Sequence, residues 1–240
     1  MTRRIGIDLG GTKIEGVVID AAGALLARER VANDADCFAL SEAADGAAAG
    51  AATVFGVILG TGTGGGVVVH QRLVSGPNAI AGEWGHNPLP WPRDDERPGP
   101  SCYCGRAGCI ETFLSGPAVA KEYAAAAGLP AGEAGPDAAT IAARAAGGDA
   151  LAESMMVRYE DRLARGLASI INVLDPHVIV LGGGLSNLAR LYTNVPARWP
   201  AWVFSDRVDT RLVAARHGDS SGVRGAAWLW TAAEAVDADR

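Results

Sequence analysis

The feature that most constrains this chain is a cluster of metal-binding side chains. The sequence holds only four histidines and four cysteines. Four of these eight side chains fall in one short stretch: His86, Cys102, Cys104 and Cys109. One imidazole and three thiolates form a tetrahedral ligand set for structural zinc and leave no open position for a substrate water. Gly105 allows the tight turn that would point the cysteines at one ion.

Two other interpretations of the cysteines stay open. They could be reduced thiols that lie close together without a metal, or two of the three could form a disulfide and leave the third unpaired. Disulfides are typical of secreted proteins, and the apolar run that follows Met1 is too brief for a signal peptide. We therefore predict zinc, with Glu83 and Glu111 flanking the ligands in the wall of a polar binding site.

Composition and charge narrow the class of protein. The 240 residues carry a net charge of −6, which argues against a nucleic-acid partner because such proteins usually present a basic face. No apolar run approaches the roughly 20 residues that span a bilayer, so no membrane partner is expected. We expect a cytoplasmic protein that is large enough to bury a sizeable core.

The hydrophobic periodicity alternates between strands and helices, which is typical of an α/β protein. Short apolar runs predict strands that include 5–9, 55–59, 177–181 and 211–215. Apolar residues at helical spacing predict helices over 36–46, 116–127, 138–146 and 151–174, with further helices around 187–192 and 223–235. A strand, a glycine turn and a second strand occur twice, which hints at an internal duplication.

Three glycine clusters each follow an apolar strand. They are Gly10, Gly11, Thr12 and Lys13; Gly60, Thr61, Gly62 and Thr63; and Gly182, Gly183 and Gly184. Glycines let the backbone present its N–H groups to an anion, and threonine hydroxyls add donors. Asp8 is placed to hold Mg²⁺ against phosphates. No cluster matches the Walker or Rossmann pattern, and each alone could be a tight hairpin turn. Together they predict a nucleotide held from both sides of a cleft.

Asp34 and Asp36 are candidate general bases. They lie between a strand and a helix start, where simple helix capping is the better explanation on position alone. In the functional interpretation, an aspartate removes a proton from a substrate hydroxyl while Asn33 hydrogen-bonds the same substrate. A zinc-bound His86 has no free lone pair for a proton at its liganding nitrogen, so it need not be a base.

These motifs together resemble the ROK family of sugar kinases, part of the wider sugar kinase and actin fold group. The resemblance rests on DLGGTK, NDAD, LGTGTGGG, GEWGH followed by CYCGRAGCIE, and VIVLGGG, and it covers nearly the whole chain. The wording of AGEWGHNPLPWP, CIETFLSG and HGDSSGVRGAAWLW is similar to bacterial fructokinases of this family, also called mannokinases. The fold implied is an actin-like ATPase (ribonuclease H-like) fold, with two lobes around a cleft.

The resemblance also implies roles for individual residues. Asp34 would be the catalytic base. The sugar would contact Asn33, Glu83, His86 and Glu111. Zinc would bind His86, Cys102, Cys104 and Cys109. ATP would be held by residues 8–13, 60–63 and 182–184, with Asp8 helping to hold Mg²⁺.

One departure from the family pattern lies ahead of Asp34. Family members carry several dozen residues there, including a helix and a strand, whereas here residues 26–31 pass directly into Ala32-Asn33-Asp34. We therefore expect a truncated N-terminal lobe over residues 1–36 and a larger lobe over residues 37–240 that contains the zinc element.

The expected activity is ATP-dependent phosphorylation of a hexose at its 6-hydroxyl, with fructose as the expected sugar and a homodimer as the implied assembly. One alternative is a catalytically impaired remnant that binds zinc and nucleotide without turnover. A less favoured alternative is a ROK-type repressor, which would carry a DNA-binding helix-turn-helix ahead of the first strand.

Overall fold

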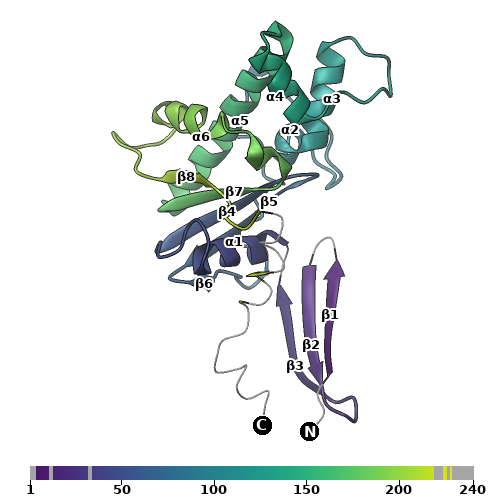
Figure 1. Cartoon of the computed structure of the whole chain (residues 1–240), viewed down its shortest axis with the longest axis vertical. Coiled ribbons are helices and arrows are strands. Elements are labelled where there is room, and N and C mark those ends of the chain that lie inside the picture. Colours follow the sequence, from purple (N-terminus) through teal and green to yellow (C-terminus); the bar gives the residue numbers. More distant parts are fainter. Residues whose placement is uncertain (1–3, 11–12, 32–33, 219–223, 226–227, 229–240) are drawn as a thin grey trace.

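The computed structural model describes residues 4–10, 13–31, 34–218, 224–225 and 228. The described chain forms two separate β-sheets, and the helices surround the second of them (Figure 1). Groups of strands and groups of helices follow one another along that second part, so the predicted α/β class is confirmed.

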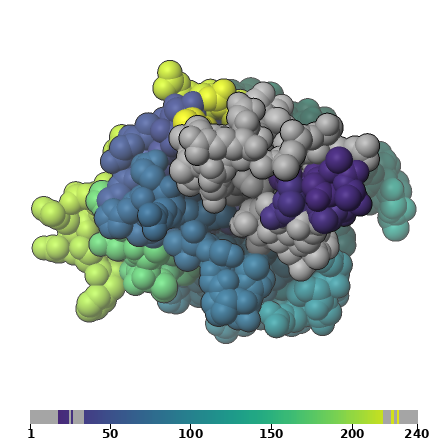
Figure 2. Space-filling model, turned by 90° about the horizontal axis from the view of Figure 1, so that it is seen from below, coloured from purple at the N-terminus to yellow at the C-terminus, as the bar shows by residue number. Residues whose placement is uncertain are grey.

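The first sheet is an antiparallel meander, and its three strands are β1 (Arg4–Gly10), β2 (Lys13–Ile19) and β3 (Leu25–Val31). Ile14 pairs with Val31, so the glycine end of the β1–β2 hairpin lies beside the end of β3. At the opposite end, the Asp20 carboxylate accepts the N–H groups of Ala22 and Ala24 and closes the β2–β3 turn. Figure 2 views the molecule from the side of this meander, with the described atoms of the turn in purple.

The second sheet has five strands in the order β6-β5-β4-β7-β8. They are β4 (Thr53–Leu59), β5 (Thr63–Val69), β6 (Arg72–Leu73), β7 (Val178–Gly182) and β8 (Arg211–Ala214). Strands β4, β7 and β8 run parallel, and β5 and β6 continue the sheet as antiparallel hairpins. The carboxyl ends of β4 and β7 therefore meet at one edge of the sheet, where open α/β sheets bind ligands.

Side chains alternate across a strand, so both faces of this sheet carry apolar side chains. Helices cover both faces. Helix α1 (Asp34–Ala44) packs on the face that carries Val54, Val68 and Val180. The opposite face, which carries Phe55, Val57, Leu59, Ile179 and Leu181, packs against the longer helices. Those helices are α2 (Glu111–Leu114), α3 (Gly116–Ala126), α4 (Ala138–Ala146) and α5 (Ala150–Leu174).

Helix α5 is the central helix of the second layer and has defined ends. The Asp149 carboxylate accepts the N–H of Ala152 at its start, as expected for an N-cap. The helix ends at Leu174, and the next residue, Asp175, has a left-handed φ of 48° directly before Pro176. This is the end that the Asp-Pro pair predicts, since proline disfavours a helical residue before it.

The short elements after β7 differ from the prediction. They are η2 (Gly184–Asn187), α6 (Leu191–Asn194) and η3 (Pro196–Ala201). The helix expected around 187–192 does not form, because Leu188 takes an extended conformation and its side chain joins the core. The helix expected over 223–235 lies mostly outside the described residues. Among the helices that are described, none is both long and apolar enough to cross a bilayer. A short helix η1 (Asp94–Glu96) lies in the loop before the cysteines.

Candidate active site and metal centre

The four predicted metal ligands come together in the metal-centre segment, which we define as residues 82–111. Two isolated bridges, Pro88 with Cys109 and Ser101 with Ala107, fold this segment back on itself. Gly105 turns the chain between the second and third cysteines with a φ of 87°, a left-handed value that favours glycine. The segment that carries the three cysteines therefore forms a compact loop.

The ligand atoms fit one zinc ion. All four lie within 4.8 Å of one another. Cys104 Sγ is 3.6 Å from Cys109 Sγ, and Cys102 Sγ is 3.4 Å from His86 Nδ1. Tetrahedral zinc with ordinary bond lengths requires sulfur–sulfur and sulfur–nitrogen separations of about 3.8 and 3.5 Å. A disulfide needs about 2 Å between its sulfur atoms, so the 3.6 Å separation is not that of a disulfide.

The environment of the thiols is uneven. Cys109 is buried and Cys104 is exposed. Burial, followed by the adjacent Cys104 and Cys102 sulfurs, raises the pKa of Cys109 to about 12. Three sulfur atoms gathered in this way are a donor set that suits a soft divalent cation.

Tyr103 is a site residue that the sequence analysis did not single out. Its hydroxyl lies 2.7 Å from His86 Nε2, and the two rings meet edge to face with centroids 4.9 Å apart. Zinc bound at Nδ1 would leave Nε2 as the nitrogen that carries the proton and donates to Tyr103. The only sequence signal was its position between two ligands in Cys-Tyr-Cys.

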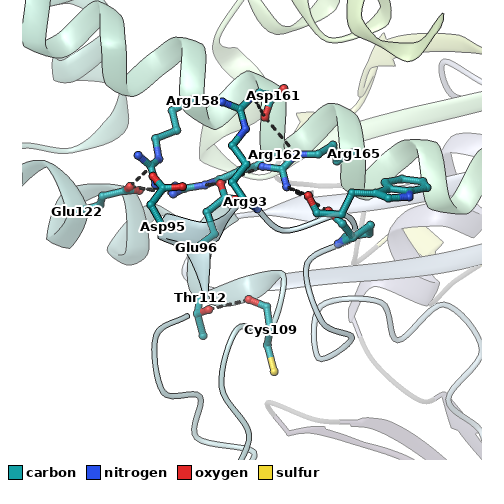
Figure 3. A network of polar contacts seen from close by, with 12 residues as sticks. Arg93, Asp95, Glu96, Cys109, Thr112, Glu122, Arg158, Asp161, Arg162 and Arg165 are labelled. Carbon is teal, nitrogen blue, oxygen red and sulfur yellow. Dashed lines mark hydrogen bonds and ion pairs between the residues drawn. The ribbon is translucent and has the colours of Figure 1, made fainter. Parts of the chain in front are cut away.

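A buried ion-pair network fastens the metal-centre segment to helix α5 (Figure 3). The carboxylate of Glu96 accepts from Arg162 at 2.8 Å and from Arg165 at 2.9 Å, and all three side chains are buried. Arg165 also donates to the carbonyl oxygens of Pro90 and Trp91. Burial alone would raise the pKa of Glu96, but the bonds from the two guanidinium groups hold it at about 2.

The second contact of this segment is with strand β5. The indole N–H of Trp84 donates to the Gly64 carbonyl at 3.0 Å, and the ring packs edge to face on Phe55. A methyl group on Gly85 would lie 1.9 Å from the Thr63 carbonyl oxygen, so only glycine permits this approach. The metal-centre segment therefore lies directly on the start of β5.

Two of the three predicted glycine clusters meet at the carboxyl edge of the five-stranded sheet. Ile58 pairs with Gly182, which places the chain after β4 beside the chain after β7. Gly183 has a φ of 79°, and a methyl group there would lie 2.5 Å from the Leu59 carbonyl oxygen. The glycine loop, which we define as residues 60–63, is closed by a bond from Gly60 N–H to the Gly62 carbonyl. Gly184 opens helix η2 at the same edge.

Glu111 joins the metal-centre segment to the glycine loop. Its Oε2 atom accepts the N–H of Thr63 at 2.9 Å. The sequence predicts that the Thr63 hydroxyl is a donor to phosphate, and this carboxylate takes only its backbone N–H. Its hydroxyl is buried, and among the described residues it has no hydrogen-bond partner. A buried polar group of this kind usually has a partner, so a bound ligand or water is expected there.

The start of helix α1 lies at the same edge. Asp34 is the first residue of α1 and is exposed, and Ala35 packs against Gly64 and Gly66 of β5. Glu83 is half-buried in the turn before Trp84. The structure thus groups Asp34, the glycine loop and the metal-centre segment around the beginning of β5.

The first glycine cluster belongs to the other sheet. Gly10 pairs with Lys13 at the end of the β1–β2 hairpin, and Asp8 lies on β1 opposite Glu15. Gly11, Thr12 and Asn33 lie outside the described residues. Because this end of the hairpin lies beside the end of β3, it is also the end nearest in sequence to α1.

Comparisons with known proteins agree with this architecture. Residues 30–233 match the sequence profile of the ROK family. The chain is 43% identical over 212 residues to the N-acetyl-D-glucosamine kinase of Yersinia pseudotuberculosis serotype O:1b, strain IP 31758. That match covers 85% of this chain and 67% of the kinase, so the chain spans about two thirds of this relative's length.

Solved structures give the same result. The crystal structure of a ROK hexokinase from Thermus thermophilus superposes with a TM-score of 0.74 at 25% identity, covering 98% of this chain and 100% of that one. A ROK family glucokinase from Streptomyces griseus, in complex with glucose and AMPPNP, gives 0.70 at 25% identity over 95% and 99% of the two chains. The chain therefore belongs to the ROK family, has the family's actin-like ATPase fold and is one of its ATP-dependent hexose kinases.

Proposed function

We propose that this chain transfers the γ-phosphoryl group of ATP to the 6-hydroxyl of a hexose, with N-acetyl-D-glucosamine as the first sugar to test. One observation carries the proposal: Glu111 of the metal-centre segment contacts the glycine loop through Thr63. The wall predicted to bind sugar therefore adjoins the loop predicted to bind phosphate, and transfer between two bound substrates requires that adjacency.

In this proposal the residues divide by task. Asp34 orients and deprotonates the sugar hydroxyl, while Asn33, Glu83, His86 and Glu111 bind the sugar. The glycine clusters at 10–13, 60–63 and 182–184 hold the nucleotide, and Asp8 helps to hold Mg²⁺, which would neutralise phosphate charge. Phosphoryl transfer depends mainly on such positioning and charge neutralisation. The two lobes are residues 1–36 and 37–240, and the family resemblance predicts a homodimer.

Zinc at the metal centre would be structural in this proposal. The donor set of three thiols and one imidazole leaves no position for a substrate, so the metal would fix the loop and take no part in the transfer. It would hold His86 Nδ1, leaving the opposite nitrogen of the ring for hydrogen bonding.

The identity of the sugar separates two candidates. The Yersinia relative is named an N-acetyl-D-glucosamine kinase, which favours that sugar. The sequence motifs around His86 are similar to those of bacterial fructokinases, which favours fructose. A coupled assay of ADP release from zinc-replete protein, with N-acetyl-D-glucosamine, fructose, mannose and glucose, decides between them. We expect the highest kcat/KM with N-acetyl-D-glucosamine; a higher value with fructose would reverse the order.

Asp34→Asn is the matched test of the base. Asparagine caps a helix about as well as aspartate, so this change removes the base and keeps the helix start. We expect kcat to fall by at least about 100-fold, with thermal unfolding unchanged. Unchanged turnover would remove Asp34 from the mechanism. Absence of sugar-dependent ADP release from folded, zinc-replete wild type would favour the remnant that does not turn over.

A further inference from the structure

Glu111 has two contacts that place it between the metal centre and the glycine loop. Its backbone N–H donates to the Gly85 carbonyl at 2.9 Å, beside the ligand His86. Its carboxylate accepts the N–H of Thr63 at 2.9 Å, from a residue 48 positions away in the sequence. One residue therefore joins the segment that holds the metal ligands to the loop at the edge of the sheet.

The glycine loop is attached to this side of the molecule at both of its ends. At one end the Gly116 N–H donates to the Gly60 carbonyl at 2.8 Å. At the other end the attachment is the Glu111 carboxylate on Thr63. The first attachment uses only backbone atoms, so the second is the one that a side-chain change can remove.

The contact is also sterically tight. A methyl group on Gly62 would lie 2.7 Å from Glu111 Oε2, which is closer than a carbon and an oxygen can approach without moving. The glycine at this position therefore lets the carboxylate lie against the loop. A change at Gly62 should disturb the same contact from the other side.

We propose that Glu111 is a positioning residue, which couples the metal centre to the glycine loop and so sets nucleotide affinity even when no sugar is present. The inference rests on the proposed function, because it takes the glycine loop as the nucleotide site. It assigns Glu111 a role that a purely sugar-binding residue would not have. Sugar contacts cannot change the affinity for a nucleotide in the absence of sugar, whereas a displaced loop can.

The test is calorimetric titration of the zinc-replete full chain with a non-hydrolysable ATP analogue and Mg²⁺, without sugar. We expect Glu111→Ala to raise the nucleotide Kd by at least about tenfold, the lower end of the usual effect of losing one hydrogen bond to a charged group. Glu111→Gln keeps an oxygen that can accept the Thr63 N–H, so it should stay within about twofold of wild type. Glu83→Ala is the control, a carboxylate of the same wall that should lower sugar affinity alone.

Gly62→Ala keeps the proposal testable if Glu111→Ala does not fold. In that case we expect Gly62→Ala to raise the nucleotide Kd in the wild-type background. Where Glu111→Ala does fold, adding Gly62→Ala to it should raise the Kd little further, because both changes break one contact. An unchanged nucleotide Kd in folded Glu111→Ala, with a loss of sugar affinity only, would overturn the coupling and leave the kinase proposal standing. Failure of wild type to bind nucleotide would instead overturn both.

Discussion

Two glycine-rich hairpins in this chain share one plan and differ in their surroundings. The β1–β2 and β4–β5 hairpins each join two seven-residue antiparallel strands through a glycine turn. The second lies in a five-stranded sheet between helix layers, with the metal-centre segment against its turn. The first lies in a three-stranded sheet that extends away from the helices (Figure 1). A glycine turn has few side chains of its own, so the elements packed around it determine its shape.

Loss of the metal centre should change the second hairpin most. Cys104 is exposed, so Cys104→Ser removes a ligand without removing core packing. We expect zinc content to fall well below one per chain and the free energy of unfolding to drop by about 4 kcal/mol in buffer with zinc at a thousandfold excess over its Kd. Hydrogen exchange should quicken at the β4–β5 turn and stay unchanged at β1–β2.

The control for that experiment is Ser101→Ala, an exposed neighbour whose bridge to Ala107 uses backbone atoms. It should keep both zinc and stability. Full zinc content in Cys104→Ser, measured by elemental analysis, would contradict the assigned ligand set. An equal loss of hydrogen-exchange protection in both hairpins would show that the metal centre does not stabilise the β4–β5 hairpin selectively.

The ion-pair network should have the next largest effect. Glu96→Gln leaves the buried guanidinium groups of Arg162 and Arg165 without their shared carboxylate, and breaking a buried pair costs about 3 to 5 kcal/mol. We expect the free energy of unfolding, measured by urea denaturation, to fall by about 3 kcal/mol. The loss is at the lower end of the range because Arg165 still bonds to Asp161 and to two carbonyl oxygens. Asp94→Asn, in the same loop but exposed, should cost less than about 1 kcal/mol. Equal losses in the two variants would show that the network does not anchor the loop.

Comparison of Gly183→Ala with Gly148→Ala should separate the energetic cost of close packing from that of backbone strain. Its φ is 79° and its added methyl would meet the Leu59 carbonyl, whereas Gly148 has a φ of 92° and open space around it. Strain alone costs about 1 kcal/mol, so Gly148→Ala should lose about that much and Gly183→Ala about 1 kcal/mol more. Thermal unfolding of both variants measures the difference. Equal losses of stability in the two variants would mean that the contact between Gly183 and the Leu59 carbonyl tolerates a methyl group.

The smallest expected effect is a pH dependence. The pKa of Glu96 is about 2 in the folded chain, below the ordinary value near 4.3 for an unfolded one. Its ionised form therefore stabilises the fold above pH 4.3, and this contribution declines as the pH falls toward 2. The stability gap between wild type and Glu96→Gln should stay constant from pH 7 to about 5 and shrink by less than about 1 kcal/mol by pH 4. A gap that widens on acidification would contradict the assigned pKa.

Sequence alone predicted what depends on local pattern. Helical spacing predicted the extent of α5 to within a residue, and the Asp-Pro pair predicted that it ends just before Asp175. The metal-ligand cluster was predictable because its four side chains lie close together in the chain. Contacts between distant residues were not predictable in this way. Nothing local indicates that Glu96 pairs with Arg165, which lies 69 positions away, or that Glu111 accepts the N–H of Thr63.

The parallel pairing of β4 with β7 also orders events during synthesis of the chain. Val54 pairs with Val178, so β4 leaves the ribosome about 120 residues before its partner. In that interval the α1–β4–β5 unit can form by local contacts, but the Phe55, Val57 and Leu59 face still lacks its helix cover. Nascent chains of intermediate length would therefore expose an apolar surface, and chaperone capture should peak at those lengths and decline once β7 has emerged.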